Sequence, residues 1–416
     1  MAEQGVHSGL SAREFTRWRN AIFTIFALSG LLLSTWASRL PVVRGDLGLS
    51  HDPATIGLML FGLSGGAIIG LSCAAQVLER FGPRLGMLGS LGTASCGIAL
   101  AGVGSSVFHS AVVVAVGLII LGFGNGMVDV IMNVEGTAVE RARGKTLLPL
   151  MHASFSLGTV LGAIVATALT ALHVDVIWHF GAIAIITAAC ATVAVRYVPE
   201  AIPDSAPVAP RKPRVSFRQR LRETLAVWSD WRLVAIGVVM LGMSFGEGSA
   251  NDWISLAVVD GHNQANATGA AIFGVFVAAE TLGRILGGPI VDRIGRVWAI
   301  RITAGLGTIG LVLFINAGAL WVVILATICW GIGISLGFPL GMSSAAEGSD
   351  QPARRVAAVA SIGYFAFLVG PPLIGYLGQE FGLLNALYLI AALLAGSFFT
   401  ARALRPATVT LPTNAP

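Results

Sequence analysis

The stretch Gly288-Pro289-Ile290-Val291-Asp292-Arg293-Ile294-Gly295-Arg296 decides the fold, because the chain contains a second, weaker copy of it. That copy reads Ala75-Gln76-Val77-Leu78-Glu79-Arg80-Phe81-Gly82-Pro83-Arg84. Each copy follows a long apolar run and places an acid, a base and a glycine in a short polar break before the next apolar run. The copies lie 213 residues apart in a chain of 416, so we expect one structural unit used twice.

The composition is that of a membrane protein. Hydrophobic residues make up 55% of the chain and charged residues only 11%, against about 25% charged residues in a typical soluble protein. Apolar segments of about the 20 residues that a spanning helix needs occur in two sets of six. They lie near 20–38, 54–78, 84–104, 107–133, 149–172, 177–197, 232–258, 267–290, 297–316, 319–343, 355–378 and 382–402. We therefore expect an all-α membrane protein with 12 transmembrane helices in two pseudo-symmetric six-helix bundles.

The basic residues orient these helices. Of the 26 Lys and Arg, 23 fall in the N-terminus, the even-numbered loops, the central segment and the C-terminus. The opposite side carries only Arg39 and Arg44, and Arg284 lies within a predicted helix. The positive-inside rule then predicts a multi-pass membrane protein with both termini in the cytoplasm. The formal charge of +5 gathers on no single face, so it does not indicate a nucleic-acid partner.

The chain divides by composition into five parts. These are a cytoplasmic N-terminus (1–19), an N-terminal six-helix bundle (20–198), a basic, proline-containing linker (199–231), a C-terminal bundle (232–404) and a cytoplasmic tail (405–416). The first apolar run is too long for a cleaved signal peptide, so we expect it to remain as the first span. The four cysteines lie scattered inside apolar runs, which favours small buried side chains over a disulfide or a zinc site.

Charged side chains within spanning helices are the first candidates for function, because each costs on the order of 2.5–3.5 kcal/mol near the middle of a span. Asp129 lies between Asn125 and Asn133 in the fourth span, at a spacing of four residues on either side. The three side chains therefore share one helix face. This polar stripe either lines a water-filled cavity, which we favour, or bonds to a neighbouring helix.

Two further polar residues follow the stripe. Glu135 is a proton-coupling candidate, although an ion pair with Arg141 or Arg143 is the favoured interpretation for the acids at this end of the helix. His152 opens the fifth span and is either a proton relay near Asp129 or Glu135, or an ordinary hydrogen-bonded residue.

The seventh span carries the strongest candidate for proton coupling. Glu247 lies near the middle of the span between two glycines, and no base lies nearby in the sequence. A carboxylate that gains and loses a proton while facing each side of the membrane in turn can couple transport to the proton gradient. Glu247 is therefore our first choice for this role and Asp129 the second.

Substrate-binding candidates surround these acids. Asn251 lies one turn beyond Glu247, and Trp253 and the equivalent Trp36 of the first span could each stack on a sugar or a flat apolar ligand. For Trp253 the alternative is an anchor at the membrane interface. Glu280 and Arg284 lie one turn apart in the eighth span, where they serve either a structural pair or substrate binding.

The pattern G-x-x-x-D-R-x-G-R resembles the signature loop of the major facilitator superfamily, which follows the second helix of each six-helix half. The second copy matches fully, whereas the first has Ala75 for Gly and Glu79 for Asp. Within the superfamily, further stretches are similar to the fucose-permease-like branch and its YbjJ-like bacterial inner-membrane members. These stretches are Trp36-Ala37-Ser38-Arg39-Leu40-Pro41, Asp129 with Asn133-Val134-Glu135, Met151-His152-Ala153-Ser154-Phe155-Ser156, Glu247 with Asp252-Trp253, and Gly363-Tyr364 with Gly370-Pro371-Pro372.

The resemblance implies two bundles around a central cavity and transport by alternating access. It also implies that the signature loops latch the outward-open state, a role that falls on Asp292, Arg293 and Arg296, and less securely on Glu79, Arg80 and Arg84. In sugar symporters of the branch an acid of the fourth helix takes part in proton coupling, which here is either Asp129 or Glu135.

Our leading hypothesis is a proton-coupled secondary transporter that imports a small polar solute such as a sugar or a related metabolite. The alternatives are a proton-driven exporter of drugs or metabolites, and a non-transporting receptor or lipid-handling protein on the same fold. An enzyme is not expected, because the sequence shows no nucleophile–base motif, phosphate loop or metal-ligand spacing. We expect a monomer in the lipid bilayer with no cofactor or metal, and with the proton as coupling ion.

Overall fold

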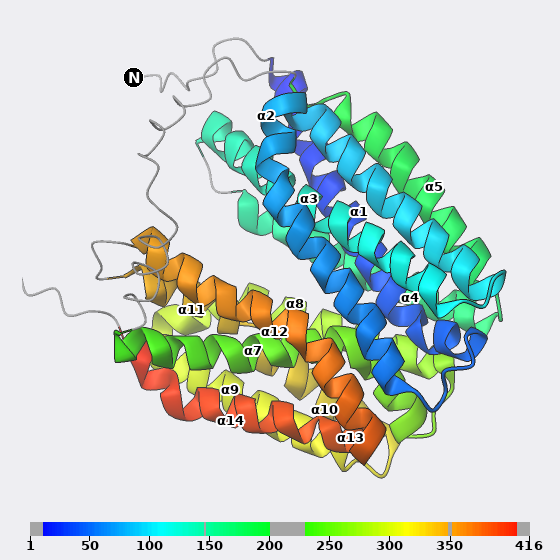
Figure 1. The fold of residues 1–416 in the computed structure, drawn as a ribbon. Coiled ribbons are helices and arrows are strands. Elements are labelled where there is room, and N and C mark those ends of the chain that lie inside the picture. Colours follow the sequence, from blue (N-terminus) through cyan, green and yellow to red (C-terminus); the bar gives the residue numbers. More distant parts are fainter. Residues whose placement is uncertain (1–10, 145–146, 200–228, 348–351, 406–416) are drawn as a thin grey trace, which may run out of the picture. The chain divides into compact units, whose positions relative to one another are not determined.

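The computed structural model of the chain describes residues 11–144, 147–199, 229–347 and 352–405 (Figure 1). Apart from its two ends, the predicted linker 199–231 lies outside the described residues, as do Lys145 and all but the first residue of the tail 405–416. No strand occurs in the four described ranges. The helices are α1 (Ala12–Asp46), α2 (Pro53–Ser106), α3 (Ala111–Arg143), α4 (Leu148–Ala171), α5 (Val176–Val195), α7 (Trp231–Leu256), α8 (Asn266–Ile294), α9 (Arg296–Ile315), α10 (Leu320–Ile334), α11 (Gly337–Ala346), α12 (Pro352–Phe381), α13 (Leu383–Ala386) and α14 (Tyr388–Thr400). A π-helical turn, η1 (Ala257–Gly261), ends α7, and a 3-10 turn, η2 (Ala401–Leu404), follows α14.

The predicted number of spans is confirmed once α2 is counted correctly. Within the described ranges, 11 helical segments are long and apolar enough to cross a membrane. One of them, α2, has 54 residues and would reach about 80 Å as a straight helix, far more than the ~30 Å of a hydrocarbon core. Its helical backbone breaks at Gly82, directly before Pro83. α2 is therefore two spans, which makes twelve.

The repeated loop has the same backbone conformation in both copies. Gly82 has φ 73° and ψ 176°, and Gly295, 213 residues later, has φ 80° and ψ 158°. Both conformations lie in a region that is open almost only to glycine. The glycine of the motif is thus required by the sharp break between two consecutive spans, and the internal repeat extends from sequence to backbone geometry.

The chain falls into two compact units. Unit 1 comprises Met1–Ser205, Asn251–Ala278 and Pro371–Asn385, and unit 2 comprises Ala206–Ala250, Ala279–Gly370 and Ala386–Pro416. The division runs through α7, α8 and α12, whereas the division by sequence keeps each of these helices whole.

Small residues bring the helices of each unit together. In unit 1, α2 packs on α3 and α5, and α1 packs on α4 and α5. A Cβ atom at Gly122 of α3 would lie 2.0 Å from the carbonyl oxygen of Leu63 in α2, so this helix pair needs glycine at its contact. In unit 2, α9 packs on α10 and α14.

The glycine of the repeated loop gives a test of the fold. We expect Gly82→Ala and Gly295→Ala each to destabilise the protein by about 1–3 kcal/mol, because the added Cβ is strained at these backbone angles. Gly288→Ala is the matched control, since Gly288 lies in the same motif within helix α8 and a Cβ there meets nothing within 4 Å. Thermal unfolding in detergent should show a lower midpoint for the first two variants and no loss for the third. Equal midpoints for Gly295→Ala and Gly288→Ala would contradict this account.

Candidate functional site

Two carboxylates share one guanidinium group in unit 2. Glu247 projects from α7, and Glu280 and Arg284 lie one turn apart in α8. Arg284 Nη2 donates to Glu247 Oε1 at 2.8 Å and also to Glu280 Oε1. The predicted pair of Glu280 and Arg284 is therefore present. Glu247 has no base nearby in the sequence, and its partner Arg284 lies 37 residues further along the chain.

The three side chains differ in how far they are enclosed. Glu280 is 7% exposed, Glu247 19% and Arg284 36%. Glu280 is thus the buried partner that fixes the guanidinium, while Glu247 and Arg284 remain accessible. With both carboxylates ionised the cluster carries one net negative charge, and one added proton makes it neutral.

The predicted polar stripe of α3 is present as a hydrogen-bonded chain in unit 1. Asn133 Nδ2 donates to the backbone oxygen of Asp129 at 2.8 Å and lies 3.3 Å from Asp129 Oδ1. His152 Nε2 of α4 lies 3.1 Å from Asn133 Oδ1. The predicted proximity of His152 to Asp129 is therefore mediated by Asn133.

The first residue of the stripe bonds to a neighbouring helix. Asn125 Oδ1 accepts a hydrogen bond of 2.8 Å from Ser29 Oγ of α1. The stripe thus bonds to a neighbouring helix at both ends, to α1 through Asn125 and to the exposed His152 of α4 through Asn133.

Glu135 does not form the ion pair that the sequence favoured. Its carboxylate is buried and accepts a hydrogen bond of 3.2 Å from Trp18 Nε1 of α1. Arg143 instead lies over the ring of Phe15, with its Cζ atom 5.6 Å from the ring centroid. Aromatic residues of α1 thus contact both Glu135 and Arg143 at this end of α3, while Arg141 interacts with Glu135 electrostatically without forming a salt bridge.

The two tryptophans expected to stack on a ligand are core residues in this structure. Trp36 is 2% exposed and Trp253 is fully buried. Each indole nitrogen lacks a hydrogen-bond partner among the described residues. Both rings are thus enclosed by protein in this structure. Asn251, the other candidate of this part of α7, is half-buried.

The charged residues of the two signature loops have unequal surroundings. In the first loop Glu79 and Arg80 are exposed, and Arg84 donates to the backbone oxygens of Arg196 and Val198 just beyond α5. In the second loop Asp292 and Arg293 are exposed, and Arg296 forms an ion pair with Glu347, which follows α11. Each loop is thus tied to its own unit through an arginine.

An ion pair that the sequence did not suggest joins distant segments of unit 1. Arg44, in the last turn of α1, pairs with Asp260 in the π-helical turn at the end of α7. The side chains are 10% and 35% exposed. Sequence analysis assigned Arg44 only to the membrane topology. A partner 216 residues away leaves no signal in a single sequence.

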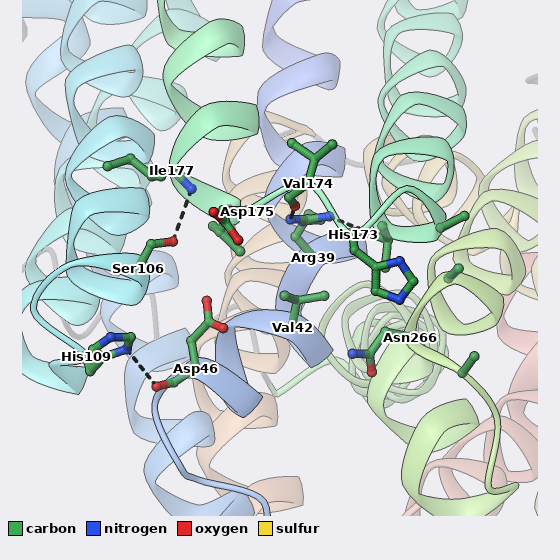
Figure 2. A pocket seen from close by; sticks show the side chains of 15 residues that line it. Arg39, Val42, Asp46, Ser106, His109, His173, Val174, Asp175, Ile177 and Asn266 are labelled. Carbon is green, nitrogen blue, oxygen red and sulfur yellow. Dashed lines mark hydrogen bonds between the residues drawn. The ribbon is translucent and has the colours of Figure 1, made fainter.

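A polar pocket of about 810 Å³ lies near the same end of α1 (Figure 2). The buried Arg39 donates to Thr170 Oγ1 at 2.8 Å and to the backbone oxygen of Val174, and so holds the turn between α4 and α5. His109 Nδ1 lies 3.0 Å from the backbone oxygen of Asp46, which also lines the pocket. These bonds give the lining a structural role, because they join the end of α1 to α4, to the α4–α5 turn and to the α2–α3 turn.

The cysteines are free, and their exposure differs in part from the prediction. Among the described residues no cluster of His, Cys, Asp and Glu suits a metal ion, and all four cysteines are free. The prediction of buried side chains is wrong for Cys96 and Cys190, which are exposed on the outside of their helices. An apolar run does not distinguish a face turned to lipid from one turned to the bundle.

Comparison with known proteins shows the family. A sequence model described as Major Facilitator Superfamily matches residues 136–362 and again residues 264–416. The chain therefore belongs to the Major Facilitator Superfamily, as the signature loops indicated. It is a multi-pass membrane transporter and not an enzyme.

Relatives and solved structures extend the likeness over nearly the whole chain. An uncharacterized MFS-type transporter of Yersinia pestis is 26% identical over 403 residues, which covers 96% of this chain and 98% of that protein. A variant of the nucleoside transporter NupG has a TM-score of 0.72 at 14% identity, over 92% of this chain and 100% of that chain. The E. coli fucose:proton symporter FucP has a TM-score of 0.60 at 14% identity, over 95% and 99%. At these identities the two structures show the fold alone.

The Arg44–Asp260 pair can be tested by exchanging its charges. Arg44→Asp should destabilise the protein by about 1–3 kcal/mol, because it leaves Asp260 facing a second carboxylate. The exchanged variant Arg44→Asp/Asp260→Arg should recover most of the loss. Thermal unfolding of both variants and of Asp260→Arg checks this, and additive losses in the double variant would show that the pair contributes nothing.

Proposed function

We propose that this protein is a proton-coupled secondary transporter that carries a small polar solute by alternating access. The observation that supports the proposal is the cluster of Glu247, Arg284 and Glu280. Two carboxylates and one guanidinium group lie within membrane-spanning helices, where an unbalanced charge is costly. One bound proton makes the cluster electrically neutral. The change between the inward-facing and outward-facing states is therefore less costly when the proton is bound.

Within this cluster we assign different roles to the two acids. Glu247 is the proton carrier, because its side chain is the more accessible carboxylate. Glu280 is a positioning residue that keeps Arg284 in place while the contact to Glu247 is made or broken. A protonated Glu247 binds the guanidinium of Arg284 less strongly than the carboxylate does. Arg284 can then donate hydrogen bonds to an oxygen-rich solute.

A polar solute suits the polar groups of unit 1. Asp129, Asn133 and His152 offer donors and acceptors in unit 1, and Asn251 adds an amide. The buried indoles of Trp36 and Trp253 remove the aromatic surface that an exporter of flat apolar compounds would use. Two proteins of the same fold carry such cargo, since NupG is a nucleoside transporter and FucP a fucose:proton symporter.

The proposed setting is the bacterial inner membrane, with both termini in the cytoplasm and the protein as a monomer. The supporting observation is that 23 of the 26 Lys and Arg lie on one predicted side. The exposed Asp292 and Arg293 belong to that side, and we propose that they act with Arg296, and with Glu79, Arg80 and Arg84 of the first loop, to stabilise the outward-open state.

Proton coupling is tested by Glu247→Gln in proteoliposomes loaded with a pH-sensitive dye. We expect addition of the transported solute, found by screening nucleosides and sugars, to move protons inward in the wild type. Glu247→Gln should lose proton movement and accumulation but keep exchange of labelled for unlabelled solute, because the amide cannot carry a proton. Glu380→Gln, an exposed acid at the end of α12, should behave as the wild type. Proton movement that persists in Glu247→Gln would refute the assignment.

Solute binding in unit 1 is tested separately with Asn133→Ala. We expect the KM for solute to rise at least tenfold, because the variant loses one or two hydrogen bonds to the solute. A tenfold change corresponds to about 1.4 kcal/mol of binding free energy. Proton coupling should be kept. Asn385→Ala is the control, because Asn385 also donates to the carbonyl oxygen four residues before it, yet lies on an exposed surface. An unchanged KM would remove Asn133 from the binding site.

A further inference from the structure

A groove with an apolar floor runs along the outer surface of unit 1 between α1 and α5. Its volume is about 530 Å³, and its floor includes Ala21 and Thr24 of α1 and Ala189, Cys190 and Val193 of α5. The α5 residues from Ala189 to Ala194 span about 8 Å along the helix, at 1.5 Å per residue, and Tyr197 follows just beyond the end of α5. Both helices are long and apolar enough to cross a membrane, so we expect lipid to meet this floor.

One end of the groove carries a positioned cation. Arg17 of α1 lies with its Cζ atom 5.6 Å from the ring centroid of Tyr197, and both residues line the groove. Arginine stacked on an aromatic ring keeps its N–H donors free for an oxygen ligand. Tyrosine is also a residue typical of the headgroup level of a membrane. The groove therefore passes from an apolar floor to a cationic mouth.

The charges around this mouth are unbalanced. Arg13 lies one turn before Arg17 on the same face of α1, and Arg196 lies next to Tyr197, with both arginines exposed. The acid of this part of α1 is Glu14, which accepts hydrogen bonds of 2.8 Å from the backbone N–H and hydroxyl group of Ser11 and also interacts electrostatically with Arg17. Arg17 forms no ion pair with a described residue. Among the described residues at the mouth, Arg13, Arg17 and Arg196 therefore outnumber the one acid, Glu14.

We propose that this groove is a binding site for one anionic phospholipid of the surrounding bilayer. An acyl chain lies along the floor formed by α1 and α5, and the headgroup phosphate accepts hydrogen bonds from Arg17. A zwitterionic lipid can fill the same floor, but its cationic headgroup gains less from the arginines at the mouth. The site lies on the lipid-facing surface and is independent of the proposed transport function.

Lipid binding to the full-length protein can be counted by native mass spectrometry from detergent. The probes are phosphatidylglycerol and phosphatidylcholine with the same acyl chains. We expect preferential binding of phosphatidylglycerol, and about a fivefold lower affinity for it in Arg17→Gln with no change for phosphatidylcholine. Ala189→Trp fills the floor and should weaken both lipids. Arg80→Gln is the matched control, because Arg80 also stacks on an aromatic ring, 5.5 Å from the Phe81 centroid, outside this groove.

A second measurement locates the lipid. Cys190 lines the groove and is exposed, while the exposed Cys96 of α2 lies outside it. Phosphatidylglycerol added to detergent micelles should slow alkylation of Cys190 by N-ethylmaleimide and leave Cys96 unaffected, and Arg17→Gln should reduce this protection. Equal binding of both lipids, an affinity that Arg17→Gln does not change, or equal alkylation of Cys190 with and without phosphatidylglycerol would each overturn the proposal.

Discussion

Two carboxylates that depend on one guanidinium group set the main electrostatic constraint in this protein. Arg284 bonds to Glu247 of α7 and to Glu280 of α8, so removal of the arginine would leave two acids without a counter-charge inside membrane-spanning helices. In a medium of low dielectric constant such a pair cannot remain ionised at small cost. The contact fixes α7 to α8, and the remaining unit of negative charge gives the cluster its capacity for a proton. In our account a stability requirement of the fold and a transport mechanism therefore rest on the same three side chains.

The two units contain different kinds of polar groups within their membrane-spanning helices. Unit 2 places a charged cluster within its helices, whereas unit 1 relies mainly on hydrogen bonds, from Ser29 to Asn125 and through Asn133 to His152. Both units are built from the same repeated element, in which glycine allows the chain to break sharply between consecutive spans. The repeat thus supplies the scaffold, and the different side chains placed on it supply separate sites for charge and for neutral polar contacts.

Local features of the sequence predicted local features of the structure. The repeated loop predicted two equivalent breaks, at Gly82 and Gly295, and four-residue spacing predicted the pairing of Glu280 with Arg284. Partners from distant helices could not be predicted. Glu135 contacts Trp18 across 117 residues, and Glu247 meets Arg284 across 37. The burial of Trp36 and Trp253 was not predicted, because hydrophobicity does not tell a helix face turned to the core from one turned to a ligand or to lipid. Those contacts are set by helix rotation and packing, which a single sequence does not encode in a readable pattern.

The claim that Glu247, Arg284 and Glu280 hold one exchangeable proton is tested most directly by infrared spectroscopy during a pH titration of the purified protein. A protonated carboxyl group has a C=O stretching band that a carboxylate lacks. All 21 Asp and Glu side chains contribute such bands as the pH falls. We predict that one of these bands persists in Asp129→Asn and Glu135→Gln and disappears in the double variant Glu247→Gln/Glu280→Gln. A band that survives in the double variant and disappears in Asp129→Asn or Glu135→Gln would place the proton in unit 1 and contradict the account.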